Sequence, residues 1–159
     1  MPVQVTGLTA NVVAVAGSDH DSCAATTTGV LCWGLNSDDQ IGNNTTVNSL
    51  VPVAVSGIGT GVSALSSQTA NTCAIVNGGA MCWGDNARGQ LGNNSTTASA
   101  VPVAVTSLTT GVQSIAVGDA FACAVTSAGA AVCWGDNAFG QLGNNSTTAS
   151  SVPVAVASA

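Results

Sequence analysis

Short apolar runs separated by turn-forming residues follow one another along the whole chain. Near its end, residues 112–117 (VQSIAV) form one run, residues 121–126 (FACAVT) alternate, and residues 130–134 (AAVCW) follow a Ser-Ala-Gly break. After a long polar loop, residues 152–156 (VPVAV) carry an early Pro, which suits an edge strand or the start of a strand. No stretch has the 3.6-residue apolar period and the caps of a helix. The pattern predicts four short β-strands here.

The same pattern occurs three times, as two recurring motifs show. A Cys-Trp-Gly motif and a Pro-Val pair each recur at intervals of 50 or 51 residues, the Pro-Val pair at Pro2, Pro52, Pro102 and Pro153. We therefore treat residues 1–159 as a single repeat domain. Its predicted parts are repeats at about 1–50, 51–100 and 101–151, and an extra Pro-Val strand at 152–156.

Four strands in a repeat of about 50 residues predict an all-β fold of three propeller blades, each with four short antiparallel strands. A closed propeller has about four to eight blades, so we expect a partial propeller that assembly completes or extends. If each blade takes its outer strand from the following Pro-Val copy, residues 1–5 are left over as an edge strand. In the alternative phase, residues 152–156 are left over. Both phases predict a spare strand that takes part in assembly.

Each repeat contains two cysteines, which a hairpin would place opposite each other. In the second repeat, Asn77-Gly78 is a strong type I′ turn signal, and closing a hairpin on it pairs Cys73 with Cys82. That pair is not hydrogen-bonded, so its Cα atoms approach closely enough for a disulfide. The other predicted disulfides are Cys23–Cys32 and Cys123–Cys133, the last around a three-residue turn that absorbs one inserted residue.

Metal binding and free thiols are the alternatives for these cysteines. Zinc sites use Cys pairs two to four residues apart and gather about four ligands. Here eight or nine residues separate the members of each pair, and His20 is the only histidine. The spacing favours disulfides over a metal site. Disulfides persist in oxidising compartments, so we expect a protein outside the cell or on its surface. We also predict no cofactor.

Composition excludes several classes of function. The net charge is −6, and a single Arg, with no Lys, cannot neutralise a nucleic-acid backbone or bind an anionic membrane surface. No apolar run is long enough to insert into a bilayer. Charged residues make up only 5% of the chain, while Ser, Thr and Asn together supply 48 residues. We therefore predict no nucleic-acid binding and no membrane insertion.

Residues that break the repeat are the candidates for chemistry, but they do not form an obvious active site. Asp19, His20 and Asp21 are neighbours that would point in different directions along a strand or turn, and no nucleophile is evident beside them. Asp85-Asn86 and Asp136-Asn137 could supply calcium oxygens, yet they lack the dense acidic spacing of a calcium loop. Hydrogen bonding within the turn is the favoured role. The sequence predicts no enzyme activity.

A Gly-Asn-Asn-[Ser/Thr]-Thr stretch in each repeat matches the N-glycosylation sequon. The candidate sites are Asn44, Asn94 and Asn145. The alternative is that one Asn-rich loop has simply been copied with the repeat.

The run Cys-Ala-x₄-Gly-x₂₋₃-Cys-Trp-Gly-x-Asn-x₂-Gly-Gln-Leu-Gly resembles the regulator-of-chromosome-condensation repeat, the unit of seven-bladed propellers. The resemblance is strongest at residues 73–92 and 123–143, and the cysteine pair is similar to that of secreted bacterial members. The chain departs from the family at Asp39, where Gly is usual. It also departs where His is frequent, at Asp21, Asn71 and Phe121.

The resemblance does not identify a single function or partner. The family includes a nuclear exchange factor for a small GTPase, which needs a basic surface, and a secreted inhibitor of β-lactamases. We predict a non-enzymatic, extracellular, self-assembling repeat protein, a homo-oligomer or filament subunit whose partner is itself. The alternative is a protein-binding or inhibitor module cut from a longer propeller. The repeating tryptophans, Trp33, Trp83 and Trp134, are predicted to be buried as framework between blades.

Overall fold

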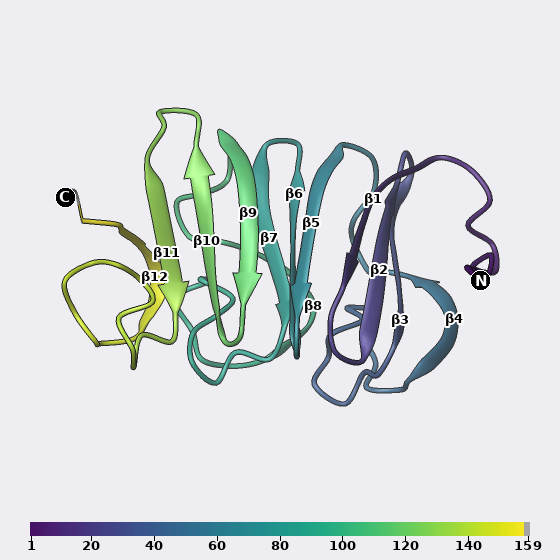
Figure 1. The fold of residues 1–159 in the computed structure, drawn as a ribbon, viewed down its shortest axis with the longest axis horizontal. Coiled ribbons are helices and arrows are strands. Elements are labelled where there is room, and N and C mark those ends of the chain that lie inside the picture. Colours follow the sequence, from purple (N-terminus) through teal and green to yellow (C-terminus); the bar gives the residue numbers. More distant parts are fainter. Residues whose placement is uncertain (158–159) are drawn as a thin grey trace.

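In a computed structural model that describes residues 1–157, the chain folds into three four-stranded antiparallel sheets, and no helix is present among these residues. Figure 1 shows the sheets standing side by side, with the two ends of the chain at opposite ends of the row. The predicted all-β fold of three propeller blades is confirmed. The described residues contain no helix of the length and apolar character that crossing a membrane requires.

Each sheet is one blade, with its strands in sequence order. Blade 1 contains β1 (Val12–Gly17), β2 (Asp21–Thr26), β3 (Gly29–Gly34) and β4 (Ser49–Ala54). Blade 2 contains β5 (Val62–Gln68), β6 (Asn71–Val76), β7 (Gly79–Gly84) and β8 (Ser99–Ala104). Blade 3 contains β9 (Val112–Gly118), β10 (Phe121–Thr126), β11 (Ala131–Gly135) and β12 (Ser150–Ala155). The first strands β1, β5 and β9 pack against one another in turn.

The outer strand of every blade comes from the Pro-Val copy that follows its other three strands, because β4, β8 and β12 pair with β3, β7 and β11. Pro52, Pro102 and Pro153 therefore lie on edge strands, where a residue without an N–H breaks no ladder. Of the two phases considered above, this one leaves residues 1–5 over. These residues have no strand structure of their own.

The three predicted cysteine pairs are cross-strand partners and are joined by disulfides. Asn77 and Gly78 both have positive φ, as a type I′ turn requires. In blade 3, Gly129 takes the left-handed conformation in the longer turn and so absorbs the inserted residue. The register of each hairpin thus follows from its turn.

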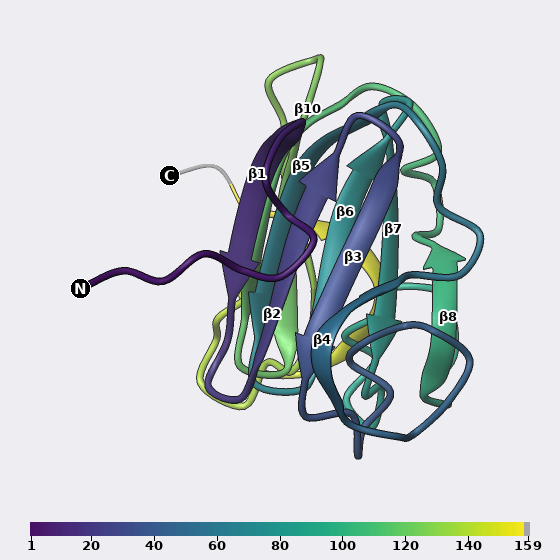
Figure 2. The same cartoon turned by 90° about the vertical axis from the view of Figure 1, so that its right-hand side faces the viewer.

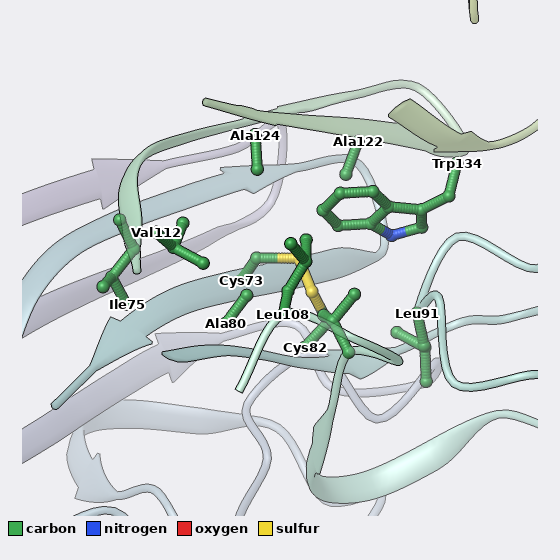
Figure 3. Packing of buried hydrophobic residues seen from close by; sticks show 11 residues of the cluster. Cys73, Ile75, Ala80, Cys82, Leu91, Leu108, Val112, Ala122, Ala124 and Trp134 are labelled. Atoms are coloured by element: carbon green, nitrogen blue, oxygen red, sulfur yellow. A yellow bond between two sulfur atoms is a disulfide. The ribbon is translucent and has the colours of Figure 1, made fainter. Parts of the chain in front are cut away.

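The hydrophobic core consists of two clusters, and each lies between neighbouring blades. Figure 3 shows the cluster between blades 2 and 3, in which Trp134 of blade 3 lies over the Cys73–Cys82 disulfide of blade 2. Trp83 occupies the same place relative to the Cys23–Cys32 disulfide of blade 1. Ala, Val, Cys, Ile and Leu side chains pack around each indole, which is the largest side chain at its boundary.

Candidate functional site: the two terminal blade faces

The two inner boundaries, one between blades 1 and 2 and one between blades 2 and 3, share one geometry. This geometry is the reference for the outward faces of blades 1 and 3, described below. At each boundary, the indole Nε1 of a Trp donates a hydrogen bond of 2.9 Å to a main-chain carbonyl in the loop of the preceding blade. The pairs are Trp83 with Gln40 and Trp134 with Gln90. Both indoles are 0% exposed, so the bond satisfies a buried donor that would otherwise be costly.

A glycine in the same loop lets each indole approach. A Cβ added to Gly92 would lie 2.8 Å from Cδ1 and Nε1 of Trp134, and one added to Gly42 would lie 2.6 Å from Cδ1 of Trp83. Both distances are shorter than any ordinary contact. Gly42 and Gly92, each the last residue of a Gln-[Leu/Ile]-Gly segment, are therefore the positions against which the indole of the next blade packs.

A second link joins the same loop to the outer strand of the next blade. The backbone N–H of Asn44 donates to the carbonyl of Ala100 at 2.9 Å, and that of Asn94 donates to Ser151 at 2.9 Å. Each inner boundary therefore combines an indole hydrogen bond, a backbone hydrogen bond and an apolar contact over a disulfide.

A buried Asn holds the loop in shape. The side-chain amide of Asn86 donates to the carbonyls of Ser95 and Thr97, and its Oδ1 accepts from the N–H of Leu91. Asn137 makes the corresponding bonds in blade 3. Hydrogen bonding within the loop, the role favoured from the sequence over calcium binding, is thus what these asparagines do. Within residues 1–157, no three His, Cys, Asp or Glu side chains come together in a group that could hold a metal ion.

Within residues 1–157 no blade precedes blade 1, and we call its outward face the leading face. It is formed by Val12, Val15, Ser22, Ala24 and Trp33 beside a hollow of about 580 Å³. Figure 2 views the molecule from this side, with β1, β2 and β3 in front. Trp33 stands at the same register position as Trp83 and Trp134, opposite the second residue of the neighbouring strand. It is nevertheless only half-buried, and Val15 is 73% exposed. The prediction that all three tryptophans are buried is therefore wrong for Trp33, because no loop covers it.

Among the residues that the structure describes, no blade follows blade 3, and we call its outward face the trailing face. It is formed by Cys123, Gln141, Leu142, Gly143 and Val156. Val156 is 39% exposed, whereas the equivalent Val55 and Val105 are buried. Gly143 is also exposed, and a Cβ there would meet only Val156, at 3.1 Å. The trailing face thus presents the glycine position against which an indole packs at the inner boundaries, but no indole of the described residues lies against it.

Residues 1–8 lie against the leading face without pairing as a strand, as Figure 2 shows for the N-terminal segment crossing in front of blade 1. Val5 and Leu8 line the same hollow as Trp33. They form a turn in which the N–H of Leu8 donates to the carbonyl of Val5 at 3.2 Å, the same bond that joins Leu108 to Val105. This segment therefore repeats the linker that covers Trp134 at the inner boundary.

The repeat-breaking residues do not gather into an active site. Asp19 and His20 are exposed, whereas Asp21 is buried and accepts hydrogen bonds from Ser18 and, across the boundary, from Ser67 of blade 2. Burial raises the pKa of the Asp21 carboxyl, while those two hydrogen bonds and the charge of His20 act in the opposite direction. Asp21 thus serves the contact between blades.

The candidate glycosylation sites share one conformation. Asn44, Asn94 and Asn145 are exposed and have φ of 63°, 60° and 59°. Their use as glycosylation sites stays a prediction.

Sequence reasoning missed the role of the Gln carbonyls, although the recurring Gly-Gln-Leu-Gly segment was the signal that could have revealed it.

Comparison with known proteins points to one family. The regulator of chromosome condensation (RCC1) repeat matches residues 77–125 and 129–159, and a second profile of the same repeat matches residues 112–141. No curated protein matches the chain.

Solved structures share the arrangement of the three blades. Human WBSCR16 superimposes with a TM-score of 0.81 at 23% identity, over 96% of this chain and 39% of its own. Prp20p from Saccharomyces cerevisiae, described with its binding properties to Gsp1p and histones, gives 0.78 at 17%, over 93% and 39%. Yeast RCC1 (Prp20) with Kap60 bound to it gives 0.75 at 16%, over 93% and 37%. The chain thus spans about two-fifths of the length of these structures, and the likeness concerns the fold alone.

Proposed function

Since this chain belongs to the RCC1 repeat family, whose propellers are generally binding rather than catalytic domains, we propose that it is a non-enzymatic extracellular protein that binds other copies of itself. The observation that carries the proposal is the pair of open faces. The leading face presents an indole without a loop, and the trailing face presents a loop without an indole. Two such faces on one molecule are halves of a head-to-tail contact.

The apolar character of these faces supports association. Val15 and Val156 are exposed on them, although the equivalent residues at the inner boundaries are half-buried or buried. Covering apolar area releases about 25 cal/mol per Å², and repeat arrays ordinarily end in polar caps. Because the contact joins different surfaces on the two molecules, it builds a closed ring if the rotation closes and a filament if it does not.

Three disulfides within one small chain support an extracellular setting, because thiols in the cytosol are kept reduced. A surface with one Arg and a net charge of −6 offers little to a nucleic-acid backbone. Both points favour a role outside the nucleus, unlike that of the family's chromatin-bound exchange factor.

Sedimentation of the 159-residue chain over a wide range of concentrations tests the proposal. We expect species heavier than the 15.3 kDa monomer that increase with concentration, and electron microscopy would distinguish rings from filaments. A chain that stays monomeric throughout would contradict self-association. It would favour the alternative, a module that binds a different protein, for which exposed Phe139 on the blade 3 loop is an available anchor.

A further inference from the structure

We infer that a second copy of the chain docks its trailing face on the leading face of the first copy, in the register of an inner boundary. For this to happen, residues 1–8 of the first copy must leave the leading face. This inference rests on the proposed self-association and specifies its contacts. The inner boundaries serve as templates, because the same repeat positions occur on both outer faces.

The outer faces carry both the indole donor and the carbonyl acceptor of the hydrogen bond that joins the blades at each inner boundary. Trp33 Nε1 has no hydrogen-bond partner within the described chain, and no donor among residues 1–157 bonds to the carbonyl of Gln141. Gln141 follows the same loop geometry as Gln90, since the N–H of Phe139 donates to its Oε1 as that of Arg88 does to Gln90. In the docked pair, Trp33 of one copy would donate to Gln141 of the other, as Trp134 does to Gln90.

The backbone link has both halves as well. Leu50 of β4 stands where Ala100 and Ser151 stand in the other blades, and its side chain is 98% exposed. Asn145 corresponds to Asn44 and Asn94, and its N–H finds no backbone acceptor in the part of the chain that the structure describes. Docking in register places the Asn145 N–H against the Leu50 carbonyl and covers the Leu50 side chain.

The surface against which an indole would pack is exposed at the trailing face. Leu142 is buried there like Leu91, but Gly143 and Val156 are exposed, where Gly92 and Val105 lie against Trp134. An indole from a second copy would cover both residues. Since the contact is built from positions that already pack twice within the chain, a second copy fits the face better than an unrelated surface does.

Residues 1–8 occupy part of the same space. At the inner boundary, the N–H of Val105 bonds to the carbonyl of Ala80, and that of Thr106 bonds to Gly92. In blade 3, the N–H groups of Val156 and Ala157 make the corresponding bonds to Ala131 and Gly143. A docked copy therefore brings its own Val156 to the position that Val5 represents. The two segments cannot cover Trp33 together, so Val5 and Leu8 compete with the second copy.

The first experiment compares Gly143→Ala with Gly129→Ala by sedimentation. Both positions have positive φ, +61° and +78°, so both variants carry the same kind of backbone strain. At Gly129 a Cβ meets nothing within 4 Å, and at Gly143 it meets within the chain only the exposed Val156, at 3.1 Å. By analogy with Gly92, a Cβ at Gly143 would also enter the space of the docked indole. We expect Gly143→Ala to weaken association about tenfold or more, because overpacking of a close contact is costly. Gly129→Ala should associate like the parent.

The second experiment weakens the competitor in the full chain with Val5→Ser and Leu8→Ser together. We expect tighter association than in the parent. We also expect acrylamide to quench tryptophan fluorescence less as concentration rises, because Trp33 becomes buried while Trp83 and Trp134 are buried already.

The outcomes separate this inference from the proposed function. If the parent associates but Gly143→Ala associates equally well, the register is wrong and self-association stands. If the register holds but Val5→Ser/Leu8→Ser leaves association unchanged or weaker, displacement of residues 1–8 is overturned. If the parent and all variants are monomeric, the proposed function itself fails.

Discussion

The boundary between blades 2 and 3 and the leading face of blade 1 use the same repeat positions, but one is packed and the other is open. Trp134 is 0% exposed and hydrogen-bonded to the Gln90 carbonyl, whereas Trp33 is half-buried with a hollow beside it. The two indoles occupy the same register position within their own sheets, Trp33 opposite Ser22 and Trp134 opposite Ala122. The difference shows that burial at this position belongs to the pair of blades rather than to the blade itself.

Removing each indole should produce the largest difference between the two regions. Trp134→Ala deletes a buried side chain and leaves a cavity, so we expect a loss of about 3–5 kcal/mol in the free energy of unfolding. Trp33→Ala removes a half-buried side chain and should cost roughly half of that or less. Urea unfolding at concentrations where the chain is monomeric measures both. Equal losses would mean that residues 1–8 cover Trp33 as well as a blade would.

The disulfides extend the comparison to the trailing face. Replacing Cys73 and Cys82 by Ala removes a short cross-link, worth about 2–3 kcal/mol by loop entropy, and also loosens the packing under Trp134. Replacing Cys123 and Cys133 removes a similar cross-link from beneath an open face. We therefore expect the inner pair to cost more in thermal and urea unfolding. If the outer pair cost more, the disulfides would act independently of the blade boundaries.

The loops of the three blades differ at one hydrogen bond. Gln90 and Gln141 donate from Nε2 to Asp85 and Asp136 at 2.8 and 3.0 Å, but Leu35 takes the place of that Asp in blade 1. The buried Nε2 of Gln40 consequently lacks a partner in the structure.

Leu35→Asn should supply the missing acceptor and raise the free energy of unfolding by about 1–2 kcal/mol. Leu35→Ala is the control, because it removes the same apolar side chain without offering an acceptor. A gain in both variants, measured by urea unfolding, would show that the absent hydrogen bond is not the cause.

The smallest expected effect is a pH dependence that arises at the boundary between blades 1 and 2. Burial raises the pKa of Asp21 in the folded state, so the folded protein binds this proton more tightly than the unfolded chain does. The resulting stabilisation is fully present below the ordinary carboxyl pKa of 3.8 and is lost as the pH rises through the raised pKa. Asp21→Asn, which introduces the residue that the second blade has at Asn71, should flatten this decline in stability.

Thermal unfolding of Asp21→Asn and of the parent across acidic to neutral pH checks the effect. Asp119→Asn is the control for net charge, because it removes a carboxylate from an exposed position. A decline of the same slope in the parent and in Asp21→Asn would place its origin elsewhere.

Much of the fold was predictable because it depends on local signals. The turn at Asn77-Gly78 sets the register of its hairpin and brings Cys73 opposite Cys82. The missing N–H of Pro predicted an edge strand or the start of a strand, and Pro52, Pro102 and Pro153 lie on edge strands. Period, turn chemistry and cysteine spacing are properties of neighbouring residues, so one sequence contains them in full.

Sequence alone determined the strands, the hairpin register and the cysteine pairing, since each depends on residues close together in the chain. Only the tertiary structure decided which phase of the Pro-Val strand completes a blade, and that Trp33 differs from Trp83 and Trp134. The indole contacts join residues more than 40 positions apart, with sequence separations of 43 and 44. The tryptophan of the same Cys-Trp-Gly motif is therefore either a buried framework residue or an open contact, according to whether a neighbouring blade covers it.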